Sequence, residues 1–545
     1  MIAKWWKSVL GPVAAAGLLI AVAAPAVGPA VPAAAASSTS GAVVDGLYEE
    51  PGNLNPILGP DMTYSQIVDN ALYRNLFMIT PKGVMEPELA ATVPTVANGG
   101  ITKDGLHYTI HLNPKAEWSN GDPFTCQDII TTWKVITNPQ VLAVTRLGWD
   151  HVKNITAVTP TECKIDLKAP FPAILIDDFT GQLPGILPSS VFANLNANQV
   201  NTGSFNHDPT VTDGPYMFQS WVPGASITVV ANPKWYGQAP KTNTIVFKVI
   251  PDQNSLLANA QAHQINVYYF APIEQAQQLK AISGAHVFYT PIAGWESADI
   301  NFRNPVLRDR NVRVALEMAI NRKAILQQIW KGLGELSAAD QSSVIWAHNP
   351  KLTPYSYDPA ESKILLTKAG WKMGSDGYRH KDGKTLQLVY ATTSGNTWRE
   401  ATERLVQYWF QQIGVKMIIH DYPANVYFGT VLPSGKGWDL GEFEWTEGYD
   451  PISSEEQLYQ TNGAQNYGLY SNKQADALIT KASQQLNQAD AKALIWQEQK
   501  ILHQDLPALW YYTPDEIDAS FNMTGYQPNP WVADTWNCED WQLAQ

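Results

Sequence analysis

The sequence predicts an α/β protein in which strands and helices alternate along much of the chain. A helical pattern from Ala401 to Ile413 lies between two strand-like runs at 386–390 and 415–420, so these segments predict a βαβ unit and a parallel layer of strands. The chain is 545 residues long and 45% hydrophobic, which is too long for one core and too apolar for a disordered chain. Further strand-like runs occupy residues 108–112, 226–231 and 244–250.

Local signals give the expected ends of several helices. Asp358 is placed to cap a helix whose first residue is Pro359, and Gly370 follows its last turn. An apolar stripe at helical spacing defines the helix that ends before Gly414. Ligands of open α/β sheets bind beyond the carboxyl ends of strands, so the polar turn 392–397 is expected to point toward any cleft. A later helix pair is predicted at 474–485 and 489–504.

Composition narrows the class of ligand. With 37 Lys and Arg against 50 Asp and Glu, the chain carries a formal net charge of -13, which removes the electrostatic case for binding nucleic acid. The unusual feature is the 20 tryptophans, because Trp offers a large rigid face that suits cores and also stacking on a ligand.

The first forty residues read as an export signal. Lys4 and Lys7 supply a positive start, residues 9–27 are uncharged and largely apolar, and the alanines that end at Ala36 match a cleavage pattern. We expect cleavage after Ala36. An uncleaved membrane anchor is the alternative, although four prolines between residues 12 and 32 disfavour a spanning helix. No later stretch is long and apolar enough to span a bilayer.

Three cysteines follow the signal segment. The first of them is Cys126, so no cysteine stands at the end of the segment to take a lipid. In an oxidising compartment Cys126 and Cys163 are the pair most worth testing for a disulfide, and small buried thiols are the alternative. Cys538 would remain unpaired. No C-x-x-C or H-E-x-x-H pattern occurs, so neither a zinc site nor any other metal or cofactor is expected.

Motifs for catalysis are missing as well. The chain has no G-x-S-x-G elbow, no phosphate-binding loop and no G-x-G-x-x-G. A pair of carboxylates could still serve a glycosidase, because such a pair is defined by separation in space. A binding protein is the leading interpretation, and a secreted carbohydrate-active enzyme is kept as an alternative.

A series of short motifs, in order, resembles the family 5 extracellular solute-binding proteins, the oligopeptide, dipeptide and nickel-chelate receptors of ABC importers. The resemblance extends from about Gly46 to Tyr512. Each motif is weak singly, but their common order is a strong signal. The motifs are Asn53-Leu-Asn-Pro56, 103–112, 118–128, Thr212-Asp-Gly-Pro-Tyr216, 232–237, 308–322, 358–371, 466–472 and Asp505-Leu-Pro-Ala508.

The resemblance implies a two-lobed periplasmic-binding-protein fold of type II with an additional domain inserted in the first lobe. It implies a monomeric, exported receptor, in the periplasm or at the outer face of the cell membrane, that captures an oligopeptide between closing lobes. The receptor then delivers it to the membrane permease subunits of an ABC importer. An oligosaccharide is the alternative ligand. The implied division is lobe I at 37–80, 186–293 and 513–545, the inserted domain at 81–185, and lobe II at 294–512.

The resemblance also places an amine-binding carboxylate. In peptide receptors of this family an aspartate of a D-Y-x-D-P-like stretch pairs with the α-ammonium of the peptide. Here the stretch is Trp445-Thr-Glu-Gly-Tyr-Asp-Pro451, which puts Glu447 at that position and Gly448 where an aromatic residue usually stands. A longer carboxylate can still bind an amine. The alternative is a loop carboxylate that faces solvent, and Asp450 reads as a turn former as much as a ligand contact.

Other candidates follow from position and from aromatic character. In members of the family the segment that corresponds to the acidic pair at 49–50 runs along the cleft. A strand predicted to cross into lobe II carries two more candidates, Trp295 and Asn301. The tryptophans beside the acidic segment 439–447 suit sugars as well as peptides. Core packing is the alternative for an isolated tryptophan. These candidates are Glu49, Glu50, Trp295, Asn301, Trp438, Trp445 and Tyr511.

Overall fold

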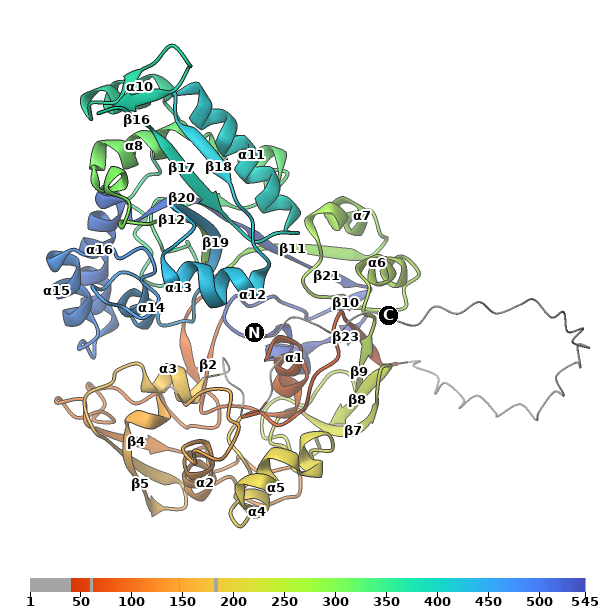
Figure 1. The fold of residues 1–545 in the computed structure, drawn as a ribbon. Coiled ribbons are helices and arrows are strands. Elements are labelled where there is room, and N and C mark those ends of the chain that lie inside the picture. Colours follow the sequence, from red (N-terminus) through yellow and green to blue (C-terminus); the bar gives the residue numbers. More distant parts are fainter. Residues whose placement is uncertain (1–40, 59–61, 147, 181–184, 545) are drawn as a thin grey trace, which may run out of the picture. The chain divides into compact units, whose positions relative to one another are not determined.

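The computed structural model describes residues 41–545 apart from 59–61, 147, 181–184 and 545 (Figure 1). Residues 41–545 form one compact unit. The expected signal segment and its cleavage site after Ala36 lie outside the described residues. Within the described part of the chain, no helix combines the length and the apolar character needed to cross a membrane.

The first large sheet has seven strands in the order β11-β21-β10-β1-β9-β8-β7. β1 pairs in parallel with both β9 and β10, and the remaining neighbours are antiparallel. The strands predicted at 226–231 and 244–250 are confirmed to within one residue. The strands are β1 (Val43–Leu47), β7 (Tyr216–Val222), β8 (Ser226–Ala231), β9 (Thr244–Val249), β10 (Val267–Tyr268), β11 (Ala285–Pro291) and β21 (Asp515–Phe521).

The second large sheet has six strands in the order β13-β20-β12-β19-β17-β18. β17 and β18 pair in parallel with α11 between them in the chain, so the predicted βαβ unit is confirmed. The strands are β12 (Gly294–Ile300), β13 (Glu335–Leu336), β17 (Gln387–Ala391), β18 (Lys416–Ile419), β19 (Leu440–Thr446) and β20 (Ala508–Thr513). Its helices are α8 (Arg310–Ala319), α9 (Arg322–Gln328), α10 (Pro359–Lys368), α11 (Thr397–Gln412), α12 (Ala424–Val426), α13 (Leu432–Ser434), α14 (Pro451–Leu458), α15 (Lys473–Ala482) and α16 (Gln488–Asp505).

Two helices of this region begin and end at the capping residues that the sequence predicts. The carboxylate of Asp358 accepts a 2.9 Å hydrogen bond from the N–H of Glu361, which caps α10 as expected. α11 stops before Gly414, whose φ of 82° most other residues adopt only with strain. The predicted pair of helices before Pro507 is present as α15 and α16.

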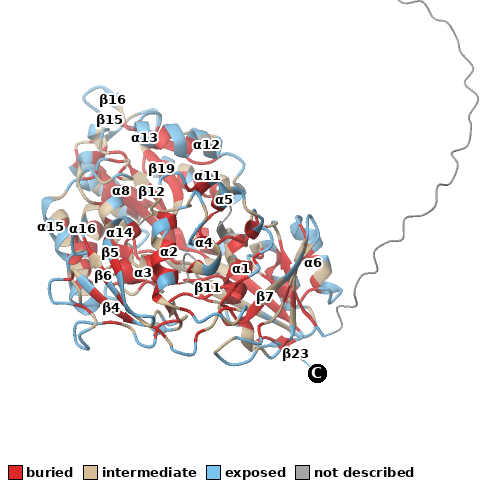
Figure 2. Cartoon of the chain, turned by 90° about the horizontal axis from the view of Figure 1, so that it is seen from below, coloured by how far each residue is buried: buried red, intermediate tan, exposed pale blue. Residues whose placement is uncertain are grey.

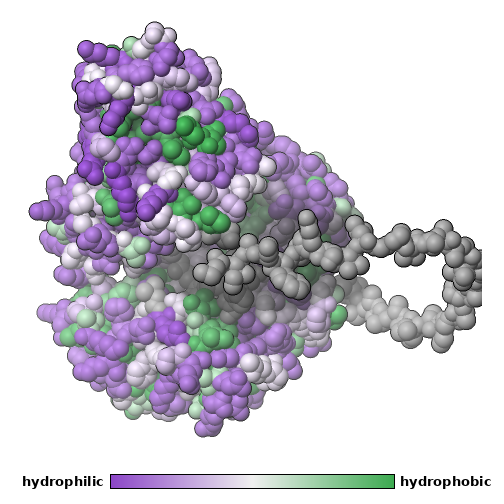
Figure 3. Space-filling model, viewed as in Figure 1, coloured by the Kyte–Doolittle hydropathy of each residue, from purple (hydrophilic) through white to green (hydrophobic). Residues whose placement is uncertain are grey.

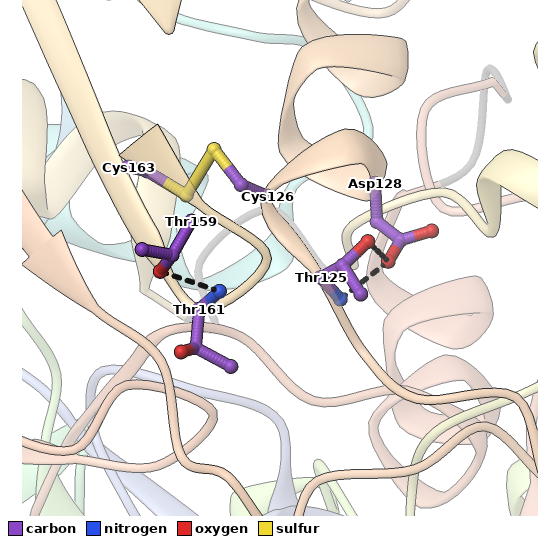
Figure 4. The surroundings of a disulfide bond; sticks show 6 residues. All are labelled: Thr125, Cys126, Asp128, Thr159, Thr161 and Cys163. Carbon is purple, nitrogen blue, oxygen red and sulfur yellow. Dashed lines mark hydrogen bonds between the residues drawn. A yellow bond between two sulfur atoms is a disulfide. The ribbon is translucent and has the colours of Figure 1, made fainter. Parts of the chain in front are cut away.

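A third sheet, in the order β4-β6-β5, carries the disulfide (Figure 4). Cys126 is the first residue of α2 and is joined to Cys163 on β6, with their Cα atoms 5.5 Å apart. The N–H of Thr125 donates a 2.7 Å hydrogen bond to the carboxylate of Asp128, which fixes the start of α2. Of the two alternatives for these cysteines the structure has the disulfide, and Cys538 is free and buried. The elements here are α2 (Cys126–Ile136), α3 (Ile174–Phe179), β4 (His107–His111), β5 (Val152–Thr159) and β6 (Glu162–Leu167).

Buried residues lie on the strands and on the inner faces of the helices (Figure 2). One apolar core runs from the seven-stranded sheet into the three-stranded sheet, and another fills the space around the six-stranded sheet. Small sheets complete the fold: β2 (Phe77–Ile79) with β3 (Met85–Pro87), β14 (Lys372–Met373) with β15 (Arg379–Lys381) and β16 (Lys384–Thr385), and β22 (Met523–Thr524) with β23 (Gln542–Leu543). The remaining α-helices are α1 (Met62–Leu72), α4 (Ser189–Phe192), α5 (Ala197–Thr202), α6 (Gln253–Gln261) and α7 (Ala276–Lys280).

Candidate functional site

The loop between β19 and α14 holds the two carboxylates that the sequence singles out. β19 ends at Thr446 and α14 begins at Pro451, so Glu447 and Asp450 lie just beyond the carboxyl end of a strand of the six-stranded sheet. Asp450 has an extended backbone and precedes a proline at the first helical position, which is the expected start of a helix. Local sequence therefore fixes where these two side chains are presented.

Glu447 is half-buried rather than open to solvent. Its N–H donates a 2.7 Å hydrogen bond to the carbonyl of Ala293, which anchors the loop to the neighbouring segment. Oε1 accepts a 3.4 Å hydrogen bond from the amide of Gln341, while Oε2 is shielded from solvent and has no hydrogen-bond partner among the described residues. Burial, with the charges of Asp340 and Asp450, raises the pKa of Glu447 well above its usual range. The carboxylate thus has an oxygen available for a ligand.

A second carboxylate faces this loop from another part of the chain. Asp177 lies on α3, and burial together with the charge of Asp450 raises its pKa to about 7. Burial also raises the pKa of Asp450 to about 6. Asp177 Oδ2 is buried without a hydrogen-bond partner among the described residues. The charge of Asp450 therefore acts on Asp177, and a cation near these carboxylates would relieve the repulsion.

Sequence reasoning missed Asp177. It belongs to the stretch Ile174-Leu-Ile-Asp-Asp178, in which two carboxylates stand directly after apolar residues. That pattern is a signal for buried acidic groups, but the sequence does not show that Asp450 lies opposite.

The same loop contacts a hairpin that is distant in the sequence. The hydroxyl of Tyr449 donates a 2.7 Å hydrogen bond to the carbonyl of Gly83, in the turn between β2 and β3. The Tyr449 ring also packs edge-on against Trp531, with centroids 5.2 Å apart. An apolar cluster surrounds these contacts, and its buried members include Ile79, Ala293, Ile345, Ile452, Ile495 and Val532. The carboxylates of the loop therefore lie beside an apolar junction between separate parts of the chain.

Figure 3 shows hydrophilic residues over most of the face in view, with smaller apolar patches among them.

Three predicted aromatic contacts are in fact core residues. Trp295 on β12 is fully buried in an apolar cluster, so the interpretation that it faces ligand is wrong and core packing is correct. Trp438 is 3% exposed and packs with Tyr427 and Phe443. Tyr511 is fully buried, and its hydroxyl lies 2.9 Å from that of Tyr390. Each of these rings is enclosed by the six-stranded sheet and its helices.

The polar candidates Asn301 and Glu50, outside this loop, make hydrogen bonds within the fold. The amide of Asn301 donates 2.9 Å hydrogen bonds to the carbonyls of Gly435 and Trp438, which accounts for its burial. Glu50 accepts a 2.7 Å hydrogen bond from the indole of Trp221 and so holds the β7–β8 hairpin. Asn301 thus has a structural role, and one oxygen of Glu50 is used within the first lobe. Glu49 is exposed on the segment after β1.

Trp445 differs from the other predicted aromatic residues because it is only half-buried. Its ring stacks near that of Tyr467, with centroids 6.3 Å apart and planes 18° from parallel. Beside it a cavity of about 10 Å³, room for one water molecule, is bordered by Asp299 and Tyr459. Burial raises the pKa of Asp299 to about 7. Trp445 thus offers an aromatic face within three residues of Glu447.

Two large mixed sheets, a smaller third sheet and a carboxylate loop beside an apolar junction define a protein built to bind a solute. The chain belongs to the bacterial extracellular solute-binding proteins, family 5, whose pattern matches residues 85–491. The oligopeptide-binding protein AppA of Bacillus subtilis is 26% identical over 528 residues, which covers 93% of this chain and 92% of that protein. The oligopeptide-binding protein OppA of Mycobacterium tuberculosis is 25% identical over 468 residues, 82% of this chain and 71% of that protein.

Solved structures share the fold. HbpA2 from Haemophilus parasuis superposes with a TM-score of 0.81 at 20% identity and covers 92% of this chain and 100% of its own. AppA from Bacillus subtilis in complex with a nonapeptide gives a TM-score of 0.70 at 24% identity and covers 93% of this chain and 99% of its own. The two-lobed type II architecture of this family is therefore the fold of the chain, and the class is a binding protein rather than an enzyme.

Proposed function

We propose that this protein is the oligopeptide receptor of an ABC importer. Glu447 carries the proposal, because it stands at the position of the amine-binding carboxylate of peptide receptors and keeps one shielded oxygen without a partner. Relatives that span most of the chain are named oligopeptide-binding proteins, which supports this ligand class.

The chemistry of Glu447 suits a peptide amino terminus. An ammonium group that donates to a carboxylate makes a charge-assisted hydrogen bond, stronger than a bond between neutral partners. Asp450 and Asp177 add negative charge around the same position, and no ion pair from a Lys, Arg or His to any of these three carboxylates is present among the described residues. The ligand therefore supplies the positive charge. Trp445 supplies an aromatic wall next to it.

The peptide is captured between two lobes. Lobe I comprises residues 37–80, 186–293 and 513–545, the inserted domain 81–185, and lobe II 294–512. A ligand that contacts both sides stabilises the closed form by its greater affinity for that form. The closed receptor then docks on membrane permease subunits. The protein acts as an exported monomer in the periplasm or at the outer face of the membrane.

The test measures peptide binding by calorimetry with the intact exported chain. Free peptides are expected to bind, and N-acetylated forms of the same peptides to bind at least about tenfold more weakly, since they lack the charged amine. Glu447→Gln is expected to remove that difference, whereas Glu274→Gln, at an exposed position near the seven-stranded sheet, keeps it. Equal affinity for free and acetylated peptides overturns the role of Glu447.

An oligosaccharide is the second candidate, favoured by the near-parallel rings of Trp445 and Tyr467. Aromatic faces of this kind stack on sugars. A glycan panel run beside the peptide panel separates the two, because a ligand that binds only the native state raises the melting temperature, and raises it further as its concentration exceeds Kd. Native mass spectrometry of protein isolated gently from its source identifies a retained ligand directly.

A further inference from the structure

Behind Glu447 lies a set of three fully buried carboxylates. Asp340 follows β13, Glu455 is on α14 and Glu498 is on α16, and one oxygen from each lies within 4.8 Å of the other two. All three side chains have no exposed surface. Three segments far apart in the sequence therefore converge on one point with acidic groups only.

These carboxylates lack the partners that buried charges need. Both oxygens of Glu498, Oδ1 of Asp340 and Oε2 of Glu455 are buried with no hydrogen-bond partner among the described residues. No ion pair of the described chain reaches any of the three. An isolated buried carboxylate is costly unless it is paired, protonated or bound to a metal. Something must therefore neutralise this cluster.

Two neutral side chains point to a ligand at the same place. The amide of Gln341 lies against the cluster, donating a 2.8 Å hydrogen bond to Glu455, and its Oε1 is buried without a partner. The hydroxyl of Tyr459, on a side chain that is 5% exposed, is also without a partner. The charges of Asp340 and Glu455 add to burial in raising the pKa of that hydroxyl, so the field of the cluster reaches it. A cation bound in the cluster would supply a partner for these uncharged oxygens as well as for the carboxylates.

We propose that Asp340, Glu455 and Glu498, with Gln341 and Tyr459, form a site for a divalent cation, Ca²⁺. The atoms of these side chains that could bind a cation are oxygens, which suits a hard cation. One oxygen from each carboxylate lies within 4.8 Å of the other two, close enough for a single cation with calcium–oxygen distances of about 2.3–2.6 Å, and Ca²⁺ accepts irregular geometry more readily than Mg²⁺ does.

The site ties three segments of the second lobe to the amine-binding loop. Gln341 contacts both Glu455 and Glu447, so its amide lies between the cation site and the carboxylate proposed to bind the peptide. A bound cation holds α14 and α16 together, and it fixes Gln341 behind the peptide site. The inference rests on contacts within this lobe and does not require that the ligand be a peptide.

The test titrates CaCl₂ into full-length protein stripped with a chelator. One equivalent is expected to bind by calorimetry, and excess Ca²⁺ is expected to raise Tm by about 2 °C or more, with a smaller effect from Mg²⁺. Glu498→Gln is expected to weaken Ca²⁺ binding at least about tenfold. The matched control is Asp45→Asn, which neutralises another fully buried carboxylate, on the seven-stranded sheet, and is expected to leave the Ca²⁺ response unchanged.

A second measurement does not depend on any variant. Tb³⁺ replaces Ca²⁺, and its luminescence sensitised by nearby aromatic rings is expected to fall as CaCl₂ competes. The proposal is overturned if the unaltered protein shows neither calorimetric binding nor a competed Tb³⁺ signal, or if Glu498→Gln binds Ca²⁺ as the unaltered chain does. Peptide binding with no response to Ca²⁺ would refute the cation site alone, and a response to Ca²⁺ without peptide binding would refute the proposed ligand alone.

Discussion

The hydroxyl of Tyr449 donates a 2.7 Å hydrogen bond to the backbone carbonyl of Gly83. Tyr449 lies two residues after Glu447, and Gly83 forms the turn of the β2–β3 hairpin with a φ of 69°. A Cβ atom at Gly83 would approach the Tyr449 ring to 3.5 Å, so ring and turn are in close contact. The bond joins the loop proposed to bind the peptide amine to a hairpin that the proposed division places outside lobe II.

Replacing Tyr449 by Phe removes that hydroxyl and leaves the ring. A hydrogen bond contributes about 1 kcal/mol net, so a bond that belongs to the closed form is expected to cost about fivefold in peptide affinity. Calorimetry with the same free peptide measures the change.

The control for Tyr449→Phe is Tyr216→Phe. Tyr216 is fully buried, and its hydroxyl donates a 2.8 Å hydrogen bond to the carbonyl of Thr242 within the first lobe. That variant is expected to lose about 1 kcal/mol of unfolding free energy and to keep its peptide affinity. Loss of affinity in both variants would show that the Tyr449 bond has no special part in closure.

Peptide affinity is expected to increase as the pH rises from 5 to 7. The pKa of about 6 leaves Asp450 largely protonated at pH 5, the raised pKa of Glu447 acts in the same direction, and a protonated carboxyl cannot pair with an ammonium. The peptide amine stays charged over this range, since its usual pKa is about 7.7–8.0. Calorimetry at pH 5, 6 and 7 measures the trend. If the affinity for the free peptide changes with pH no more than that for its acetylated form, these carboxylates do not bind the peptide amine.

Removing the disulfide by the double change Cys126→Ala and Cys163→Ala is expected to lower stability. The bond joins residues 37 apart, and a loop of that length corresponds to ~4 kcal/mol in the chain-entropy account, with measured values of about 2–4. Urea denaturation of the variant gives the loss of stability. In the unaltered protein, unfolded but not reduced, a thiol assay should find one free thiol, that of Cys538. Three reactive thiols would contradict the pairing.

Sequence reasoning succeeded where local chemistry decides the structure. The cap at Asp358, the end of α11 at Gly414 and the βαβ unit follow from residues next to one another in the chain. The turn 392–397 is buried at its start and mostly exposed beyond it, and its predicted place beside a cleft stays a prediction. Arg399 on α11 donates hydrogen bonds to Thr393 and to Glu296 on β12, a long-range contact that local sequence does not show.

The candidate site was harder to predict because it depends on contacts between distant segments. The motif singles out Glu447, whose role stays a prediction, but it does not show that the charge of Asp450 acts on Asp177, far away in the chain. Trp295 and Trp445 stand opposite each other on neighbouring strands, yet one is fully buried and the other half-exposed. Residue type is the same for both, so only the packing of helices around the sheet distinguishes them.

Asp45→Asn is expected to stabilise the protein at alkaline pH. Burial, with the charge of Asp518, raises the pKa of Asp45 to about 8, whereas an unfolded aspartate titrates near 3.9. The native state therefore holds a proton that the unfolded state has lost, and stability falls as the pH rises from about 4 to about 8. An asparagine at this position does not titrate, so the variant does not lose stability in this way. Urea denaturation should show a smaller fall in unfolding free energy between pH 5 and pH 8 for the variant than for the unaltered protein, and equal falls would contradict the raised pKa.

The buried ion pair of Arg399 and Glu296 provides a last prediction. Nε of Arg399 lies 2.7 Å from Oε1 of Glu296, a second nitrogen lies 3.2 Å from Oε2, and both side chains are at least nine-tenths buried. Arg399→Met leaves Glu296 enclosed beside Glu442, and loss of one partner of a buried pair costs about 3–5 kcal/mol.

Replacing both residues should restore much of that stability. Arg399→Met combined with Glu296→Met leaves no uncompensated charge, and substitution of a whole buried pair by apolar residues is often neutral. The single variant should also lose more at pH 8 than at pH 5, because Glu296 without its partner takes up a proton at the lower pH. Urea denaturation of both variants at the two pH values tests this. If the double variant is as unstable as the single one, the cost comes from lost packing around Arg399, and the pair does not carry the stability assigned to it.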